Sequence, residues 1–291
     1  MLRSTLDAVG RSTRTPDRLL VVDSASVSPV VGEVARDAGA DLVRCEIPGL
    51  GRARNAGLAH VREDLVAFTD DDCLPEPQWL ERIVQAFSDL SEPGFITGQV
   101  RADVLPTGRA TLTLGLTDEV ESRVLGTGDD PRLFGHGANM AWRRRDLERI
   151  GGFDEAMGVG SILRAGEDVD AWWRATAAGV TGLYVPNVLV FHRQWRSRRA
   201  ALRSYYGYGV GLGAVTLKRA RVTDGHSGAQ ATSTLVRRLL LEGLGPVWGS
   251  MRRGYQMAVV ADSLMLVGGI RGALLARKLP VVNGHFEHVP A

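Results

Sequence analysis

The sequence is poor in the features that mark secreted, membrane-spanning and nucleic-acid-binding proteins. Its two cysteines, Cys45 and Cys73, have no metal-ligand spacing and imply no disulfide framework, which fits the cytosol. Residues 1–12 are too polar for the apolar segment of a signal peptide. No run reaches the roughly 18 apolar residues of a membrane-spanning helix, and the nearest, residues 257–270, contains Asp262. A net charge of +2 is too small for a dedicated nucleic-acid binder. We therefore expect a cytoplasmic protein that binds no nucleic acid.

The composition is that of a soluble globular protein with an uneven distribution of charge. Of its 291 residues, 44% are apolar and 23% are charged, so the chain can bury one large core with or without an appendage. Acidic residues gather at positions 70–72 and 167–170, and arginines gather at positions 193–203. This distribution suits a metal site that faces a phosphorylated ligand, together with a basic surface near something anionic.

Short apolar runs alternate with helical patterns in the first two thirds of the chain. Strands are predicted at residues 19–23, 41–45, 65–69, 95–100, 139–142 and 183–192, and helices at residues 29–39, 51–61, 77–88, 145–150 and 167–178. The alternation indicates βαβ units and hence an α/β fold with a mainly parallel sheet.

The regions outside this pattern are less regular. Residues 105–133 form a candidate lid or acceptor loop, and residues 221–230 a predicted break. From Arg198 onward the pattern is helical. Residues 257–270 fit a packed C-terminal helix better than a helix on a membrane surface, but the second interpretation stays open.

Three consecutive carboxylates, Asp70, Asp71 and Asp72, follow the predicted strand at residues 65–69. Adjacent acids repel one another, and a divalent cation would offset that repulsion. Carboxylate oxygens are the ligands that Mg²⁺ and Mn²⁺ prefer, and both ions leave positions for substrate phosphates. The end of a strand in an open α/β sheet is also where such folds bind ligands. The alternative is an acidic cap for the helix near Pro77, for which one Asp would suffice.

A second group of acids, Glu167, Asp168 and Asp170, lies in the first turn of a predicted helix. The simpler explanation is that these side chains complement the helix dipole, each stabilising by about 0.3–1 kcal/mol. The other is that one carboxylate next to a metal site acts as a general base toward a hydroxyl. The presence of the first acid group favours the second explanation.

Three further features are compatible with a ligand site but do not require one. His192 ends a predicted strand, where it is either structural or a ligand for an ion such as Mn²⁺. The arginines at positions 193–199 are either a solvated basic face or a clamp on a diphosphate or an anionic lipid surface. The glycine-rich residues 135–140 allow close approach to a ligand or simply a tight turn.

Taken together, these segments resemble the inverting family 2 glycosyltransferases, which have a GT-A fold. The matching segments run in the family's order and are residues 20–24, 51–57, 68–79, 137–141, 151–155, 166–170 and the strand that ends at His192. The resemblance implies a doubly wound sheet of GT-A type with helices on both faces and a helical C-terminal extension. It covers residues 19–208, and its motifs are specific only jointly.

The resemblance also implies roles for individual residues. Asp23 would contact the nucleotide base, and Arg54 would lie near the nucleotide. Asp70 and Asp72 would form the DxD pair that holds Mn²⁺ or Mg²⁺ and the sugar-diphosphate, with Asp71 in support. Asp168 would be the general base, and His192 would be a further metal ligand.

The chain departs from the family's pattern at its start. Family members begin with a strand and a Pro-Thr-Tyr-Asn-like turn, whereas residues 1–9 already resemble the first helix. The missing strand would lie between the strands at residues 19–23 and 65–69. We therefore predict that these two strands are either separated or paired directly. In both cases the wall that binds the base next to Asp23 would be incomplete.

These observations predict a catalytic domain at residues 1–195 and a helical, membrane-proximal region at residues 196–291. The expected reaction is a metal-dependent, inverting transfer, of hexosyltransferase type, from a nucleotide-sugar donor. The acceptor would be a saccharide, a lipid-linked molecule or a small molecule, with a place in cell-envelope polysaccharide synthesis. We expect peripheral contact with the inner face of the membrane. The alternatives are a truncated, non-catalytic scaffold and, with less support, a sugar-nucleotide pyrophosphorylase.

Overall fold

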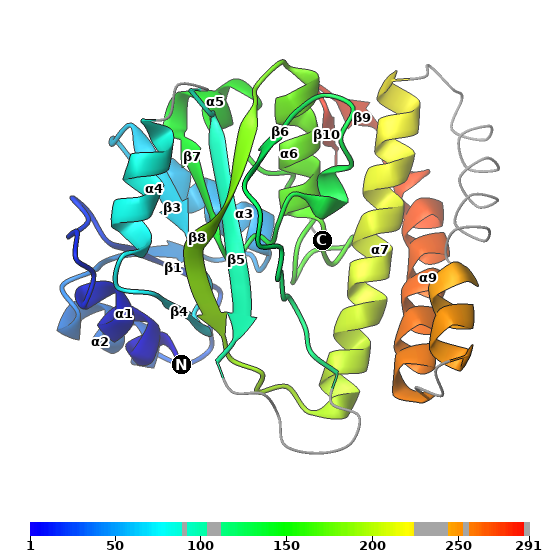
Figure 1. The fold of residues 1–291 in the computed structure, drawn as a ribbon, viewed down its shortest axis with the longest axis horizontal. Helices are drawn as coiled ribbons and strands as arrows, with labels where there is room; N and C mark the ends of the chain where they lie inside the picture. The colour runs from blue at the N-terminus through cyan, green and yellow to red at the C-terminus, as the bar shows by residue number, and fades with distance from the viewer. Residues whose placement is uncertain (89–91, 104–111, 224–243, 253–255, 288–291) are drawn as a thin grey trace.

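The computed structural model describes residues 1–88, 92–103, 112–223, 244–252 and 256–287 (Figure 1). Its strands are β1 (Leu20–Ser24), β2 (Asp41–Cys45), β3 (Leu65–Phe68), β4 (Cys73–Pro75), β5 (Phe95–Ala102), β6 (Arg123–Leu125), β7 (Met140–Arg143), β8 (Gly182–His192), β9 (Val281–Val282) and β10 (His285–Phe286). Its helices are α1 (Leu2–Gly10), α2 (Val30–Asp37), α3 (Leu50–Leu58), α4 (Trp79–Phe87), α5 (Arg144–Arg149), α6 (Glu167–Ala177), α7 (Arg198–Thr223) and α9 (Gln256–Ala276).

A six-stranded sheet forms the centre of the molecule, with the order β3-β7-β5-β8-β4 and with β6 paired to β8. Its two longest strands, β5 and β8, are parallel, and β3 runs in the same direction because both β3 and β5 are antiparallel to β7. The fold is therefore α/β of the predicted type. The short strands β4, β6 and β7 run the opposite way, which the sequence pattern did not indicate.

The sheet buries both of its faces because its strands are apolar at consecutive positions. Phe95 and Trp142 belong to one core with α6 and α7, whereas Ile96 and Ala141 belong to a second core with α4. Side chains alternate between the faces of a strand, so neighbouring residues enter different cores. Trp79 of α4 is 2% exposed and closes the second core. Helices thus cover both faces, as predicted.

The strands β1 and β2 form a parallel pair of their own. Within the described residues no ladder connects β1 to β3, so these two strands are separated, which is one of the two predicted arrangements. A small core of Leu6, Val21 and Val34 holds α1 and α2 against β1. The hydroxyl of Thr5 donates to the backbone carbonyl of Asp71 at 2.9 Å, which ties α1 to the first acid group.

The C-terminal part contains two long helices, α7 and α9, which lie side by side (Figure 1). A shorter helical segment at residues 244–252 precedes α9, and the β9–β10 hairpin follows it. Glycines bring their backbones together, because a Cβ on Gly209 or Gly213 would lie 2.0 Å from a carbonyl oxygen of α9. The helix α7 continues to Thr223, and most of the predicted break at 221–230 lies outside the described residues, as do residues 105–111 of the candidate lid.

The helix α9 is longer than the predicted helix at residues 257–270. By length and composition it could cross a membrane, with a mean hydropathy of 1.6 and with 28% of its most apolar window buried. Its one acidic residue, Asp262, accepts a hydrogen bond from Ser250 at 2.8 Å.

Candidate active site

The pairing of β4 with β8 brings the first acid group to His192. In this ladder Cys73 lies opposite His192, so the preceding residue, Asp72, comes next to the imidazole. Asp72 Oδ1 lies 3.4 Å from His192 Nε2. The other carboxylate oxygen accepts a hydrogen bond from Trp195 Nε1 at 2.8 Å and lies 3.6 Å from Arg196. A carboxylate that follows β3 thus meets side chains from the segment after β8.

The surroundings of Asp72 keep it ionised. Burial alone would raise its pKa, but hydrogen bonds from His192 and Trp195, with the positive charges of His192 and Arg196, lower the pKa of Asp72 to about 2. The neighbouring thiol behaves in the opposite way. Burial and the carboxylates of Asp70 and Asp72 raise the pKa of Cys73 far above its usual range. Cys73 is therefore a protonated thiol, which excludes it as a nucleophile, as the sequence indicates.

The donors around Asp72 fit a hard divalent cation. The ligand atoms of Asp72, Cys73 and His192 lie within 4.8 Å of one another, and all three residues are buried. A carboxylate and an imidazole are ligands that suit Mn²⁺, whereas a protonated thiol contributes little. His192 Nδ1 lies 3.1 Å from the carbonyl oxygen of Leu114. Nδ1 also lies 2.8 Å from the side-chain amide nitrogen of Gln194, so that the ring proton can lie on Nε2 and be donated to Asp72. A divalent cation bound by Asp72 and His192 would take the place of this proton.

The other two acids of the first group point elsewhere. Asp70 Oδ1 lies 3.6 Å from Arg54, and Asp70 is not a member of the group formed by Asp72, Cys73 and His192. The Asp71 side chain is exposed. Partial desolvation and the carboxylates of Asp72 and Asp70 raise the pKa of Asp71. The structure therefore brings Asp72 and His192 together and places Asp70 beside Arg54.

Arg54 of α3 connects the first acid group to the second. Its guanidinium group is buried, donates to Glu167 Oε1 at 2.7 Å and donates to the carbonyl oxygen of Gly137 at 3.1 Å. The group also lies over the ring of Phe153, 5.4 Å from its centroid. Because an arginine presents several donors in a fixed plane, one side chain can hold Asp70, Glu167 and the turn at Gly137 in a single arrangement.

The three acids in the first turn of α6 point to three different partners. Glu167 is buried against Arg54, and Asp170 is fully buried against Arg174 and Lys218. Asp168 is partly exposed, and its Oδ2 accepts a hydrogen bond from the backbone N–H of Gly137 at 2.8 Å. Of these three carboxylates, only Asp168 is both oriented and accessible to a ligand.

Glu167 differs from Asp168 in its ionisation as well. Burial and the neighbouring Asp168 carboxylate raise the pKa of Glu167 to about 7, and Arg54 opposes this change. A carboxyl group with such a pKa could act as a base. The ion pair with Arg54 occupies it, however, and its side chain is 6% exposed.

Asp23 lies at the end of β1 and contacts residues of the β1–β2 unit. Its Oδ2 is 2.5 Å from Arg44, and its Oδ1 accepts a hydrogen bond from the backbone N–H of Ser26 at 3.0 Å. Burial would raise the pKa of Asp23, but Ser26 and Arg44 lower it. In the described part of the chain, no hydrogen bond or ion pair connects Asp23 to Asp70, Asp72 or Arg54.

Sequence reasoning missed two aromatic side chains and a histidine of the site. Trp195 holds Asp72, although an exposed tryptophan after a strand carries no recognisable signal. Burial raises the pKa of Tyr208 on α7 to about 12, and Asp70 and Asp168 are among the charges that act on its hydroxyl. His136 lies in the glycine-rich turn, with its ring centroid 6.4 Å from that of His192. Burial lowers the pKa of His136, so this imidazole is neutral.

Comparison with known proteins connects this geometry to sugar transfer. The model of the family described as "Glycosyl transferase family 2" matches residues 1–151. The pre-mycofactocin glycosyltransferases of two Mycobacterium tuberculosis strains, CDC 1551 / Oshkosh and ATCC 25618 / H37Rv, are 32% identical to this chain over 206 residues. That alignment covers 65% of this chain and 41% of each relative, so the chain spans less than half of the relatives' length.

Two solved structures share the fold. The mannosyltransferase PcManGT from Pyrobaculum calidifontis, in complex with GDP-Man and Mn²⁺, superposes with a TM-score of 0.60 at 17% identity, over 93% of this chain and 82% of that chain. Residues 1–349 of TarS from S. aureus superpose with a TM-score of 0.51 at 14% identity, over 98% of this chain and 91% of that chain. At these identities the likeness establishes the GT-A type of architecture.

Proposed function

The chain belongs to glycosyl transferase family 2, and from this premise we propose that it transfers a sugar from a nucleotide-diphospho-sugar to an acceptor hydroxyl with inversion at the anomeric carbon. The observation that carries the proposal is the convergence of Asp72, His192, Arg54 and Asp168, from four separate segments, on one acidic site. Such an excess of carboxylates suits a metal-bound diphosphate better than a neutral ligand.

Asp72 and His192 would hold Mn²⁺ or Mg²⁺, and Asp70 would contribute a further carboxylate from the same loop. The bound ion would neutralise negative charge on the leaving diphosphate. Arg196, 3.6 Å from Asp72, adds a positive charge at the same place. Support comes from the chemistry of the donors and from the Mn²⁺ and GDP-Man bound to PcManGT.

Asp168 would remove the proton from the acceptor hydroxyl. The hydrogen bond from Gly137 fixes one carboxylate oxygen, so that the carboxylate meets the acceptor in one orientation. Glu167 and Asp170 are held in ion pairs, which favours Asp168 among the three acids. An acceptor oxygen that attacks from the side opposite the diphosphate inverts the anomeric carbon in a single displacement. The sugar is expected to be a hexose.

The nucleotide would lie between Asp23 and Arg54. Asp23 is expected to contact the base and Arg54 to lie near the nucleotide, while Asp71 would support the metal-binding loop. Because no ladder between described residues joins β1 to β3, we expect the base-binding wall next to Asp23 to be incomplete. We expect this part of the donor site to bind the base weakly.

The first test measures the thermal unfolding of the protein with a panel of nucleotide-sugars, with and without Mn²⁺. One nucleotide-sugar should raise the melting temperature only when the metal is present, since a ligand at 100 times its Kd stabilises by about 2.7 kcal/mol. The Asp72→Asn variant should lose this effect, and Asp17→Asn, which changes an exposed carboxylate outside the site, should keep it. If no donor stabilises the protein with metal present, the non-catalytic scaffold becomes the better explanation.

The C-terminal helices would place the enzyme at an anionic membrane surface. Trp248 is 62% exposed, and Val260 and Val267 of α9 are 43% and 55% exposed. The exposed Arg271 and Lys278 provide positive charge on and just after the same helix, each worth about 1 kcal/mol near anionic lipid. Co-sedimentation with phosphatidylserine vesicles should be lost in high salt and reduced in Trp248→Ser. Failure to bind at low salt would refute this contact.

A further inference from the structure

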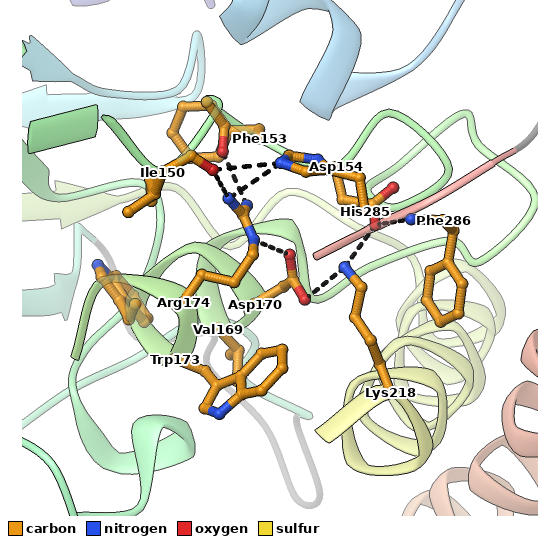
Figure 2. Close-up of polar contacts among 12 residues, drawn as sticks. Ile150, Phe153, Asp154, Val169, Asp170, Trp173, Arg174, Lys218, His285 and Phe286 are labelled. Atoms are coloured by element: carbon orange, nitrogen blue, oxygen red, sulfur yellow. Dashed lines mark hydrogen bonds and ion pairs between the residues drawn. The ribbon is translucent and has the colours of Figure 1, made fainter. Parts of the chain in front are cut away.

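A second group of charged side chains lies on the other side of α6, fully enclosed by protein (Figure 2). Lys218 of α7 has no exposed side-chain surface, and its Nζ lies 2.5 Å from Asp154 Oδ2 and 2.8 Å from Asp170 Oδ1. Arg174 donates to the other oxygen of Asp170 at 2.8 Å. Two cations therefore neutralise two carboxylates. The chain has only two lysines, and the other, Lys278, is exposed.

Stability alone is a weak reason for such a group. Burying charges costs several kcal/mol for each ion, and well-packed apolar residues often replace a buried ion pair without loss of stability. The ammonium group of lysine is compact and can bridge two carboxylates at once. What the group provides is a fixed connection between segments that are distant in the sequence.

The connected segments are the turn after α5, the start of α6, the helix α7 and the C-terminal hairpin. Asp154 Oδ2 also accepts the backbone N–H of Phe286 in β10 at 2.8 Å, and Lys218 Nζ lies 4.8 Å from the centroid of the Phe286 ring. Arg174 donates to the carbonyl oxygen of Gly152 at 2.7 Å. The C-terminal region is thus bonded to the helix that carries Asp168.

Asp168 and Asp170 belong to the same helical turn, so fixing one restricts the other. Side chains that are two positions apart in an α-helix point in directions about 200° apart. The Asp170 side chain therefore points toward α7, and the Asp168 side chain points toward the site. The backbone of α7 also touches the residues that precede this turn, since a Cβ on Gly211 would lie 2.3 Å from the carbonyl oxygen of Ala165. Gly166, which starts the turn, has a φ of +85°. These contacts and the backbone conformation of Gly166 therefore restrict the movement of the first turn of α6.

We propose that Lys218 is a positioning residue of the active site: through Asp170 it fixes the first turn of α6 so that the Asp168 carboxylate meets the backbone N–H of Gly137. The inference rests on the proposed role of Asp168 as the base. It assigns to α7 and the β9–β10 hairpin a part in the chemistry that is independent of any membrane contact.

The test compares Lys218→Met with Lys278→Met, the same change at the exposed lysine. Lys218→Met should lower kcat roughly 10-fold to 100-fold, because a displacement of about 1 Å at a reacting group has effects of this size. The KM for the donor should stay within about twofold, because Asp72 and His192 do not contact the cluster. Lys218→Arg should recover part of kcat, and Lys278→Met should match the wild type. Equal kcat in Lys218→Met and the wild type would overturn the proposal.

Because Lys218→Met leaves two buried carboxylates with one arginine, a double variant guards against misfolding. Lys218→Met/Asp154→Asn removes one charge of each sign, and it should fold while retaining the loss of kcat. If both variants melt early but the folded fraction turns over at the wild-type rate, Lys218 is only structural.

A readout that does not use activity separates this inference from the proposed function. Hydrogen exchange of the Gly137 amide reports its bond to Asp168, whatever Asp168 does in catalysis. Exchange of this amide should become faster in Lys218→Met and stay unchanged in Lys278→Met. In the Asp168→Asn background, Lys218→Met should cause no further loss of kcat. A fully active Asp168→Asn would refute the base, whereas unchanged exchange at Gly137 would refute the positioning role.

Discussion

The first turn of α6 separates two groups of carboxylates that differ in how they are neutralised. On one side, Asp154 and Asp170 meet Lys218 and Arg174, and their charges balance within the protein. On the other side lie five acids, Asp70, Asp71, Asp72, Glu167 and Asp168. Arg54 forms ion pairs with Asp70 and Glu167, and Arg196 lies 3.6 Å from Asp72.

The difference shows how a structural and a ligand-binding group of acids can be told apart. Buried charges are stable when each has a partner, so a balanced group needs nothing from solution. A group with excess negative charge is stabilised by a cation that binds to it. The two groups meet in the first turn of α6, where Glu167 and Asp168 precede Asp170, and both consist mainly of aspartates. Their partners, and not their composition, therefore distinguish them.

The largest expected effect distinguishes the two groups of carboxylates by their contribution to the rate of sugar transfer. Asp168→Asn is nearly isosteric and should lower kcat by roughly 10²–10⁴, because the amide cannot accept the proton. Its melting temperature and its donor-induced stabilisation should remain those of the wild type, since the bond from Gly137 can still form to the amide oxygen. Steady-state kinetics and thermal unfolding measure both. Full activity in Asp168→Asn, with an inactive Glu167→Gln, would transfer the role to Glu167.

The second largest expected effect distinguishes the two groups of carboxylates by their contribution to stability. Asp170→Asn breaks a buried ion-pair group and should cost about 3–5 kcal/mol of unfolding free energy, because Arg174 then loses its carboxylate and Lys218 keeps only Asp154. Urea unfolding gives this value. The same change at Asp168 should cost less than about 0.5 kcal/mol, because this position is partly exposed and the amide can still accept the hydrogen bond from Gly137. Equal costs at the two positions would remove the distinction between the groups.

The two groups should also respond to pH in opposite directions. The pKa of Glu167 is raised to about 7, above its ordinary value of 4.5, so the native state binds more protons between these values. The metal-free protein should therefore lose unfolding free energy as the pH rises from about 4.5 to 7. Ion pairs with Lys218 and Arg174 lower the pKa of Asp170 despite its burial. The stability that Asp170 contributes is present above its unfolded pKa of about 3.9 and is lost as the pH falls through its lower native value.

Two variants check these signs by urea unfolding across the pH range. Glu167→Gln should flatten the decrease between about pH 4.5 and 7. Asp170→Asn should remove part of the loss of stability in acid. An unchanged pH profile in either variant would contradict the assignment for that group.

A smaller effect concerns the indole that holds Asp72. Trp195→Phe keeps the ring but removes the Nε1 donor, which leaves one carboxylate oxygen free to rotate. Residues that orient a metal ligand typically change metal affinity 10-fold to 100-fold when altered. Because Trp195 is 54% exposed and water can replace its donor, we expect roughly a tenfold weaker affinity for Mn²⁺. Isothermal titration with Mn²⁺ measures it, and an unchanged Kd would show that Trp195 does not orient the ligand.

The smallest expected effect concerns an exposed ion pair that belongs to neither group of carboxylates, and it shows how much such a pair contributes to stability. Arg144 and Glu148 form an i,i+4 pair at 2.8 Å on α5, where the Glu148 side chain is 47% exposed. Glu148→Gln should cost at most about 0.5 kcal/mol in urea unfolding, because water screens the pair. A larger cost would mean that ion pairs anywhere in this fold are structural, and the contrast with Asp170 would lose its meaning.

Local patterns were enough to predict most of the architecture. The strand β2 occupies the predicted residues, and β3, β5, β8, α4 and α6 lie within one or two residues of their predicted bounds at most ends. Each has an apolar run or a helical period that its own sequence displays. The acid groups and His192 were singled out because their residue types are unusual at strand and helix ends, whereas Arg54 was named only through the family resemblance. The roles given to these residues stay predictions.

The missed features depend on residues that are distant in the sequence. The strand β4 contains Pro75 and three residues in all, and it is a strand only because β8 pairs with it. Lys218 has the appearance of a surface lysine in a helix, since lysines are seldom fully buried. The division of labour among Glu167, Asp168 and Asp170 likewise follows from tertiary contacts that no local pattern contains.

The ladder between β4 and β8 joins residues that are synthesised at very different times, so the contact between Asp72 and His192 forms late in synthesis. It joins Cys73 to His192, so Asp72 leaves the ribosome long before its imidazole partner exists. At about 5–20 residues per second, the delay is roughly 6–24 s. During this time Asp72 lacks the strand whose last residue, His192, later lies beside it, and contacts between such distant residues form slowly. Asp72 therefore meets His192 only when most of the sheet has been synthesised, so the proposed metal site forms late.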